Sequence, residues 1–501
     1  MARQGNSSAA RAARMRATAS YFGAGVIGGA KLPVSMPVAP LLFAGTARLS
    51  GWAGNAAKVA RSANPTTPQT FGFDATGRLD LAAIETYVGG VNVAARVDTL
   101  LDQSGNGFDL IQTTQGARAF VQRSQLAGAA LPFTAGPNIQ YPIPAGLSVD
   151  RANHSVFLVL RPHLARASYY WIRMGTTLSY GTTTPDTATA GGGARILDAA
   201  NGNASKVQSR APKTSGVAIM GYSSGASDVK FYNNRVIETV AGALTPGTLT
   251  GGTIENGNGY SEIMAVAIFP RALTAAEMAS VGKSLEAVAA LQLGQTNGVF
   301  MIGDSITAGQ GSVAVYTAGL GMTATEPDQL FGALGNPTDT AIFNCGQPSI
   351  PLTALNSAND RNRINELIGA YPELTKRVAR VHAGINDLRA GSTDTTIYNA
   401  MVAYCNYLRG LGVKVITSTI NTQVVDATYT AQAETYRLSI NSQIRANWAT
   451  FADDMVDYAN IPEMADPSNT TYFASDKLHQ TANAYQLKSA LVAPKIAALL
   501  A

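Results

Sequence analysis

The sequence predicts a multidomain protein in which a β-sandwich is followed by a three-layer α/β domain with a parallel sheet. Length is the first indication, because 501 residues exceed one ordinary domain. From Phe71 to Leu285, short alternating apolar runs are separated by polar turns, which is typical of an all-β sandwich. Beyond Val299, strand-like runs alternate with amphipathic helical segments, which indicates βα units around a parallel sheet.

Residues 1–73 are predicted to form a basic arm rich in Ala and Gly. They hold eight Lys or Arg residues and no Asp or Glu, which leaves 29 basic and 32 acidic residues in the rest of the chain. The net charge of +5 therefore originates in this segment, and the mildly acidic body argues against a nucleic-acid-binding face. The longest apolar stretch, 34–44, contains Pro37 and Pro40 and is too short to span a membrane.

Three interpretations of this arm stay open at the level of sequence. It has the composition of a poor secretory signal, of an acid-poor transit peptide, or of an arm that packs into a larger assembly. The Gly and Pro interruptions count against a signal and favour the assembly arm. A disordered, solvated tail is the remaining alternative.

Residues 74–290 are predicted to form the β-sandwich. Strands are expected at 154–160, 169–172, 217–220 and 262–269. The runs 228–232 and 235–237 predict a hairpin, because Asn233 and Asn234 tolerate the positive φ of a tight two-residue turn. Thr274 and Glu277 match a capping box, which predicts a helix that ends near Ala289.

Polar side chains in the loop 101–110 predict a hydrogen-bonded turn rather than a calcium site, which needs more convergent oxygens. They are Asp102, Asn106 and Asp109. This loop, the hairpin and the closing pattern Leu273-Thr274-x-x-Glu277 together resemble the concanavalin A-like (laminin G-like) jelly roll. The resemblance implies carbohydrate binding. The aromatic residues at 169–171 are candidates for a sugar-stacking face, although aromatic residues in strands more often lie in a core.

Residues 291–501 are predicted to form the α/β domain, after a polar, turn-forming linker at 294–298. Five strands are expected, at 299–304, 340–345, 378–383, 413–419 and 454–458. Helices are expected at 395–411, 430–448 and 482–500. No phosphate-binding or dinucleotide-binding glycine pattern occurs, so no cofactor is expected.

A candidate nucleophile stands at the end of the first of these strands. The run Val299–Gly303 ends in Gly303-Asp304-Ser305, which delivers a serine into a turn at the carboxyl edge of a parallel sheet. A serine hydroxyl needs a base and a group that stabilises the charge on the attacked carbonyl oxygen. Asp304 is expected to brace the turn.

The candidate base is a histidine near the C-terminus. The chain has four histidines, and His479 is the one with a carboxylate three residues earlier, Asp476. This spacing allows Asp476 to accept the Nδ1 proton and leaves Nε2 directed at the serine. His382 lies within a predicted strand and is expected to be a core or loop histidine.

Two other strand ends offer donors for an oxyanion. Gly346 ends the run 340–345, where a backbone N–H can approach a ligand because no side chain intervenes. Asn386 follows the run 378–383, and its amide NH₂ can point at an oxyanion. Asp387 is expected to fix this loop by hydrogen bonds.

Metal binding is not expected, since the histidines are scattered and no His or Cys pair has ligand spacing. The two cysteines, Cys345 and Cys405, do not make a disulfide framework, and buried free thiols are favoured over a bridge between them.

The four segments in this order resemble the SGNH (GDSL-type) hydrolases over about the last two-fifths of the chain. The resemblance implies a catalytic triad of Ser305, His479 and Asp476, and an oxyanion hole made by the Ser305 N–H, the Gly346 N–H and the Asn386 side chain. Two positions depart from the family pattern. Lys477 stands where the family often has glycine, and Gln480 where it often has proline.

These resemblances together imply a serine esterase that removes acyl groups, O-acetyl first, from a carbohydrate or surface polysaccharide. They fit a phage tail spike or fibre protein on the virion surface, homo-oligomeric and commonly trimeric, which contacts other virion proteins through its N-terminal arm. A secreted bacterial carbohydrate esterase and a non-catalytic glycan-binding virion protein are the alternatives. No nucleic-acid partner and no membrane span are expected.

Overall fold

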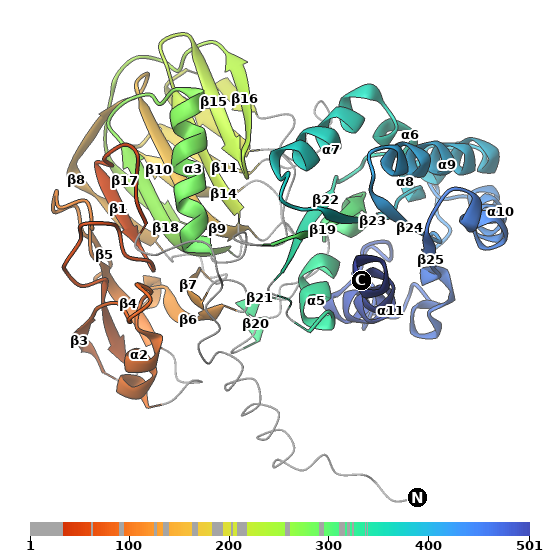
Figure 1. Ribbon diagram of the computed structural model, residues 1–501, viewed down its shortest axis with the longest axis horizontal. Coiled ribbons are helices and arrows are strands. Elements are labelled where there is room, and N and C mark those ends of the chain that lie inside the picture. The colour runs from red at the N-terminus through yellow and green to blue at the C-terminus, as the bar shows by residue number, and fades with distance from the viewer. Residues whose placement is uncertain are drawn as a thin grey trace, which may run out of the picture.

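The computed structural model describes residues 34–61, 64–89, 95–124, 128–133, 140–162, 169–182, 194–201, 204–207, 218–255, 261–289, 295–309, 316–317, 321–322, 325–335, 337 and 339–501. A sheet-rich N-terminal part precedes an α/β part with a parallel sheet (Figure 1), so the predicted order of fold classes is confirmed. None of the helices in these ranges is both long and apolar enough to cross a bilayer.

The larger sheet of the N-terminal part has twelve strands with antiparallel pairing throughout. Its order is β16-β15-β14-β9-β18-β7-β6-β4-β2-β3, with β1 beside β18 and β5 beside β4. The bounds are β1 Leu42–Gly45, β2 Ala57–Arg61, β3 Asn64–Phe71, β4 Ala95–Leu100, β5 Leu110–Ile111, β6 Phe120–Ser124, β7 Gly128–Phe133, β9 His154–Pro162, β14 Ala218–Ser224, β15 Asp228–Asn233, β16 Val236–Ala241 and β18 Ser261–Phe269.

A second sheet of six strands packs against this one. Its order is β13-β12-β11-β10-β17-β8. The bounds are β8 Gln140–Asp150, β10 Tyr169–Met174, β11 Leu178–Thr182, β12 Ala194–Asp198, β13 Ala204–Val207 and β17 Thr248–Glu255. One buried apolar cluster contains residues of both sheets, including Trp171 and Tyr222, so the core lies between them. Trp171 is fully buried there, which confirms the core interpretation for this side chain.

Residues 34–73, which the sequence assigns to the arm, lie within this sheet-rich part, whereas residues 1–33 fall outside the described residues. β1 pairs with β18, and its Phe43 N–H donates to Asp102 Oδ1. Gln103 accepts the Leu49 N–H and donates to the Gly45 carbonyl. The loop 101–110 is therefore the hydrogen-bonded turn that was expected, and its partners are in the supposed arm.

The predicted hairpin forms between β15 and β16, but its turn is one residue later than expected. Asn233 pairs with Val236, so the two turn residues are Asn234 (φ 46°) and Arg235 (φ 70°). The helix after β18, α3 (Ala275–Ala289), covers the outer face of the twelve-stranded sheet (Figure 1). Thr274 and Glu277 exchange the hydrogen bonds of a capping box, which confirms that prediction.

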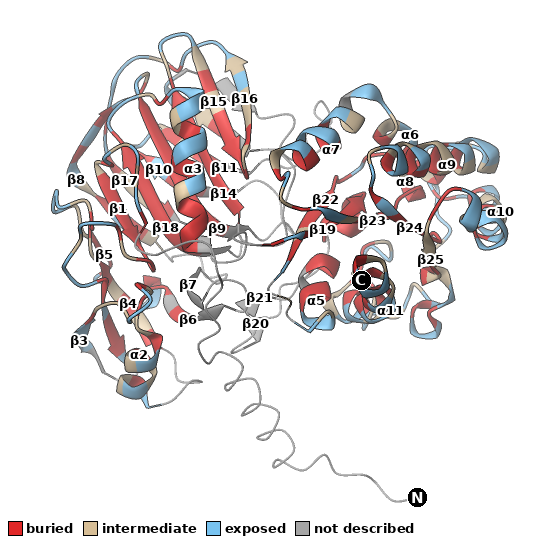
Figure 2. Ribbon diagram, viewed as in Figure 1, coloured by how far each residue is buried: buried red, intermediate tan, exposed pale blue. Residues whose placement is uncertain are grey.

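The α/β part contains the five expected strands, all parallel, in the order β22-β19-β23-β24-β25. The bounds are β19 Asn297–Gly303, β22 Thr340–Gly346, β23 Lys376–His382, β24 Lys414–Ser418 and β25 Asp454–Val456, with a small hairpin of β20 Tyr316–Thr317 and β21 Gly321–Met322. Helices cover both faces of the parallel sheet, which explains its nearly continuous apolar strands (Figure 2).

The α-helices within the described residues differ in length. Besides α3 they are α2 Leu81–Val88, α4 Ser305–Ala308, α5 Glu326–Ala333, α6 Leu352–Leu355, α7 Ala358–Ala370, α8 Ile385–Arg389, α9 Asp394–Gly410, α10 Ala431–Asn447 and α11 Ala482–Leu500. Along β19, Phe300 and Ile302 face a core shared with α7, α9 and α10, while Val299 and Met301 face a core shared with α5 and α11. The three longer helices that the sequence predicts are confirmed.

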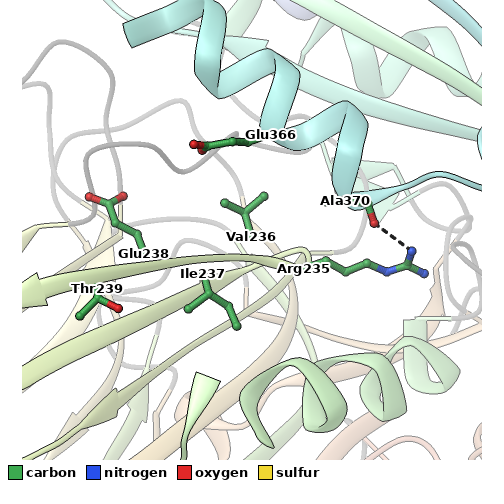
Figure 3. A pocket seen from close by; sticks show the side chains of 7 residues that line it. All are labelled: Arg235, Val236, Ile237, Glu238, Thr239, Glu366 and Ala370. Carbon is green, nitrogen blue, oxygen red and sulfur yellow. Dashed lines mark hydrogen bonds between the residues drawn. The ribbon is translucent and has the colours of Figure 1, made fainter. Parts of the chain in front are cut away.

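One arginine joins the two parts of the molecule. Arg235 forms ion pairs with the fully buried Glu286 of α3 and with Glu373, which follows α7. Its guanidinium also donates to the Ala370 carbonyl and lies 4.4 Å from the Tyr371 ring centroid. Beside it is a cavity of about 510 Å³ between β16 and α7, with Glu238 and Glu366 on opposite walls (Figure 3).

Candidate active site

The turn after β19 presents Ser305. Asp304 caps α4, because its Oδ1 accepts the Ile306 N–H at 3.0 Å. Gly303 has no room for a side chain, since a Cβ there would lie 2.2 Å from the His382 carbonyl oxygen and from Thr307 Oγ1. The serine itself is buried, with 4% of its surface exposed. The sequence interpretation of Asp304 as a brace for this turn agrees with that geometry.

The second segment is the loop 473–480, which precedes α11. Asp476 Oδ1 accepts two backbone N–H groups, from Leu478 at 3.0 Å and from His479 at 2.9 Å. The loop closes where the Ala474 N–H donates to the His479 carbonyl. Lys477 has a φ of 57°, which is the left-handed conformation that glycine adopts without strain. Lys477 therefore occupies a backbone conformation that suits glycine better than lysine.

The two segments meet in a chain of hydrogen bonds. His479 Nε2 lies 2.9 Å from Ser305 Oγ, and His479 Nδ1 lies 2.6 Å from Asp476 Oδ2. The hydrogen bond from His479, together with those from the two backbone N–H groups, holds the pKa of Asp476 well below its usual value. Asp476 is therefore a carboxylate at neutral pH. It can orient the imidazole so that Nε2 is free to accept the serine proton.

The first proposed oxyanion donor, Gly346, ends β22 beside this turn. Gly303 is in register with Gly346 on one side and His382 on the other, so three strands end together. A Cβ on Gly346 would lie 2.3 Å from the Ala308 nitrogen, hence only glycine allows this close approach to α4. The Gly346 N–H donates to Asn344 Oδ1 at 3.0 Å in this structure. The sequence interpretation did not include Asn344, because its contact with Gly346 is a local turn without a motif of its own.

The second proposed donor, Asn386, lies at the start of α8. Its Nδ2 donates one hydrogen to the Ile350 carbonyl at 3.0 Å, which leaves the other hydrogen of the amide available. Asp387 accepts hydrogen bonds from the backbone of Leu352 and Thr353 and from the Thr353 hydroxyl. Asp387 thus ties α8, which carries Asn386, to the start of α6, and this agrees with its expected role of fixing the Asn386 loop.

A small enclosed cavity of about 10 Å³ lies beside the nucleophile's turn. Its walls are Asp304, Ile306, His382, Ala383, Ile385, Ile420, Asn421, Thr422 and Leu478. Burial raises the pKa of Asp304 to about 6, although the Ile306 N–H and Lys488 oppose this shift. The cavity therefore combines branched aliphatic walls with one carboxyl group.

The other titratable candidates do not join this site. Burial lowers the pKa of His382 far below its usual value, and its Nδ1 lies 3.4 Å from Lys488 Nζ, so it is a neutral core histidine. His154 is buried in the sheet-rich part, where it contacts Tyr222, and His163 lies outside the described residues. Cys345 and Cys405 are buried free thiols. Within the described ranges, no three His, Cys, Asp or Glu side chains are grouped so as to hold a metal ion.

Comparison with protein families finds one match, to the GDSL-like Lipase/Acylhydrolase family over residues 301–487. This segment begins within β19, ends within α11 and includes Ser305, Gly346, Asn386, Asp476 and His479. The C-terminal α/β part therefore contains a GDSL-like lipase/acylhydrolase domain, which confirms that resemblance. No curated protein matches the chain.

The solved structures that resemble the chain do so at low sequence identity. An arabinofuranosidase complexed with arabinofuranosyl-α-1,2-xylobiose is 17% identical with a TM-score of 0.41, over 50% of this chain and 63% of that one. The chain thus spans less than two thirds of that protein's length. A putative acylhydrolase from Bacteroides fragilis is 16% identical with a TM-score of 0.30, over 41% of this chain and 88% of that one. A lipase/acylhydrolase from Enterococcus faecalis is 17% identical with a TM-score of 0.30, over 41% and 97%.

Proposed function

We propose that this protein is a serine esterase that removes short acyl groups, O-acetyl first, from a carbohydrate or surface polysaccharide. The observation that carries the proposal is the hydrogen-bonded chain from Ser305 Oγ through His479 to Asp476, with distances of 2.9 and 2.6 Å. The family match over the same residues supports ester hydrolysis as the reaction class.

The proposed reaction has two half-steps. In the first, Ser305 Oγ attacks the acyl carbonyl carbon while its proton moves to His479 Nε2. The tetrahedral intermediate then collapses, the ester C–O bond breaks, and His479 returns the proton to the leaving hydroxyl oxygen. In the second, His479 takes a proton from water, whose oxygen attacks the acyl-serine. Collapse releases the carboxylic acid and restores the Ser305 hydroxyl, while Asp476 stays ionised throughout.

The oxyanion of each intermediate is assigned to three donors in this proposal: the Ser305 N–H, the Gly346 N–H and the Asn386 side chain. Asn386 keeps one amide hydrogen for this purpose. The Gly346 N–H is shared with Asn344 Oδ1 and has to turn partly toward the bound oxygen. Losing a single donor of this kind typically lowers kcat by about a hundred- to a thousandfold.

A short acyl group is inferred from the tight packing beside the nucleophile's turn. The cavity there contacts Asp304 and Leu478, its walls include neither Ser305 nor His479, and its volume is about 10 Å³. That volume is on the order of a single water molecule's space. Ile385 and Ile420 in its wall are buried and belong to the core of the domain, so they resist displacement by a longer chain.

A carbohydrate ester and a phage tail setting are the finer parts of the proposal. They are supported by the pairing of a sheet-rich part with an ester hydrolase domain and by the basic segment that contains Arg11, Arg14 and Arg16. In that setting the sheet-rich part binds the host glycan, and the N-terminal segment anchors a homo-oligomer to the virion. A secreted carbohydrate esterase is the alternative, and analysis of the mature N-terminus by mass spectrometry separates the two, since a signal would be removed.

The proposal is tested with a panel of acetyl, butyryl and octanoyl esters and an O-acetylated polysaccharide. We expect the wild type to hydrolyse the acetyl ester faster than the butyryl and octanoyl esters. Ser305→Ala should lose at least about a thousandfold in kcat. Ser468→Ala, which changes an exposed serine of the same domain, is the matched control and should keep the wild-type rate. If the wild type and Ser305→Ala released acetate at equal rates, the proposal of a serine esterase would be wrong.

A further inference from the structure

Three charged side chains form a buried cluster behind the nucleophile's turn. Glu326 on α5, Arg380 on β23 and Lys488 on α11 are all fully buried. Glu326 Oε2 lies 2.8 Å from Arg380 Nη2 and 3.3 Å from Lys488 Nζ, and Oε1 accepts the Tyr458 hydroxyl. A single carboxylate therefore holds two cations in the interior of the domain.

On one side, the cluster is attached to the nucleophile's turn. Arg380 Nη1 donates to Thr307 Oγ1 at 3.0 Å and lies 3.4 Å from the Ile302 carbonyl. Thr307 belongs to α4, two residues after Ser305. The cluster is thus linked to the strand that leads into the turn and to the short helix that leaves it.

On the other side, the cluster is attached to the loop that carries the base. Lys488 Nζ donates to Gln480 Oε1 at 3.1 Å. Gln480 directly follows His479, is fully buried, and closes the loop through a β-bridge with Phe473. The ammonium group also lies 4.5 Å from the Tyr458 ring centroid. Lys488 is therefore the contact through which the cluster reaches the base.

A buried lysine is costly, so its presence here needs a reason. Burial lowers the pKa of Lys488 to about 8, although Glu326 opposes the shift. An apolar side chain of similar length could fill the same space without this desolvation cost. Methionine is such a side chain, but it could form neither the hydrogen bond with Gln480 nor the ion pair with Glu326.

We propose that Lys488 is a positioning residue for the base: it holds Gln480, and with it the His479 loop, in a fixed relation to the nucleophile's turn through Glu326 and Arg380. This inference rests on the proposed esterase function. Misplacement of a reacting group by about 1 Å can cost roughly a hundredfold in rate, so a contact that fixes the His479 loop relative to the nucleophile affects kcat.

The test is a double-mutant cycle on hydrolysis of p-nitrophenyl acetate, with Lys488→Met, Gln480→Met and the double variant. We expect each single change to lower kcat by about 10- to 100-fold with KM unchanged. The double variant should fall no further than the lower single, because both changes remove one contact. Lys495→Met, on the same helix but at a partly exposed pair with Asp454, is the matched control and should keep the wild-type kcat.

A second readout keeps the outcome separate from the proposed function. We expect the proton between His479 Nδ1 and Asp476 to give a downfield NMR resonance in the wild type and in Lys495→Met, and Gln480→Met and Lys488→Met to shift or lose it. If neither the wild type nor any variant hydrolyses esters, the proposed function is wrong. The NMR resonance then tests the positioning role by itself. If folded Gln480→Met keeps both the wild-type kcat and the resonance, the inference is overturned, even where Lys488→Met fails to fold.

Discussion

At the scale of single residues, Asp304 combines two opposing effects. Its carboxylate caps α4, but burial raises its pKa from an ordinary value of 3.8 to about 6. The folded protein therefore binds this proton more tightly than the unfolded chain does. As the pH rises from about 4 to about 6, this group therefore lowers the free energy of unfolding, because the folded state must bury a charge that water would solvate.

Asp304→Asn keeps an oxygen that can accept the Ile306 N–H and removes the buried charge. We expect this variant to gain stability relative to the wild type as pH rises from 4 to 8, by roughly 2–3 kcal/mol, the free energy that corresponds to this pKa difference. Urea unfolding of both proteins at pH 4, 6 and 8 measures it. A difference in the free energy of unfolding that does not change with pH would contradict the assigned burial of charge.

The site residues differ in how far sequence alone can predict them. Ser305, Asp476 and His479 could be predicted because each stands in a short local pattern, and the structure brings all three together. Lys488 could not be predicted, because an isolated lysine in an amphipathic helix normally indicates a solvated face. Its partners, Glu326 and Gln480, come from segments whose proximity follows only from the packed fold.

At the scale of elements, the loop 473–480 contains a residue, Lys477, whose backbone conformation is unfavourable for a side chain other than glycine. Lys477 takes the left-handed conformation at φ 57° because Asp476 and His479 must face one another across it. A non-glycine residue in this region costs about 1–2 kcal/mol. The hydrogen bonds of Asp476 to the backbone offset that cost.

Replacing Lys477 with glycine should relieve this strain. We expect Lys477→Gly to stabilise the protein by about 1 kcal/mol, less the entropy that glycine gains in the unfolded chain, and Lys477→Val to destabilise it. Because the side chain is exposed and makes no contact with the reacting groups, kcat should stay unchanged in Lys477→Gly. Thermal unfolding of the two variants checks the opposite signs, and a destabilised Lys477→Gly would contradict the account of the loop.

Strands and helices of the α/β part were predictable where their periodicity is strong. The five strands and the helices α9, α10 and α11 match the expected ranges to within a few residues. Helix α7 was missed because its sequence is mostly polar, with apolar residues only near its C-terminal half at Ile364, Leu367 and Ile368. Its helical state depends on packing against the sheet rather than on local pattern.

At the scale of the whole molecule, strands β1 to β3 show what local sequence cannot reveal. β1 has four residues and β3 contains Pro65 and Pro68, so the segment 34–73 lacks a clear period. β1 and the turn after it have partners far along the chain, namely β18, Asp102 and Gln103, whereas β2 pairs with β3 and β4. The prediction that residues 1–73 form one arm rests on local sequence pattern, and local pattern does not reveal these contacts.

Arg235 is one of the contacts between the two parts, since Phe331 of α5 also belongs to the apolar cluster that contains Phe157 of β9. Removing the Arg235 side chain leaves Glu286, which is fully buried, without its cation, and such a loss typically costs about 3–5 kcal/mol. It also removes the contacts to Glu373 and Ala370 of the α/β part. The same residue is the second residue of the hairpin turn, at a φ of 70°.

We expect Arg235→Ala to split thermal unfolding into two transitions, with the N-terminal part melting first, whereas the wild type unfolds in one. Arg271→Ala provides the control, since Arg271 pairs with Glu277 of the same helix at an exposed site and such pairs contribute little. Differential scanning calorimetry distinguishes the two outcomes. A single transition in Arg235→Ala, at the wild-type temperature, would show that the parts are joined by other contacts.

In the proposed reaction, Ser305 carries the acyl group between the two half-reactions. The most direct measurement is mass spectrometry of the protein quenched during turnover of an acetyl ester, followed by peptide mapping. We expect one added acetyl group on the peptide that contains Ser305, accumulating early and absent from Ser305→Ala. Steady release of acetate with no acetyl group on Ser305, or with the group on another residue, would contradict it.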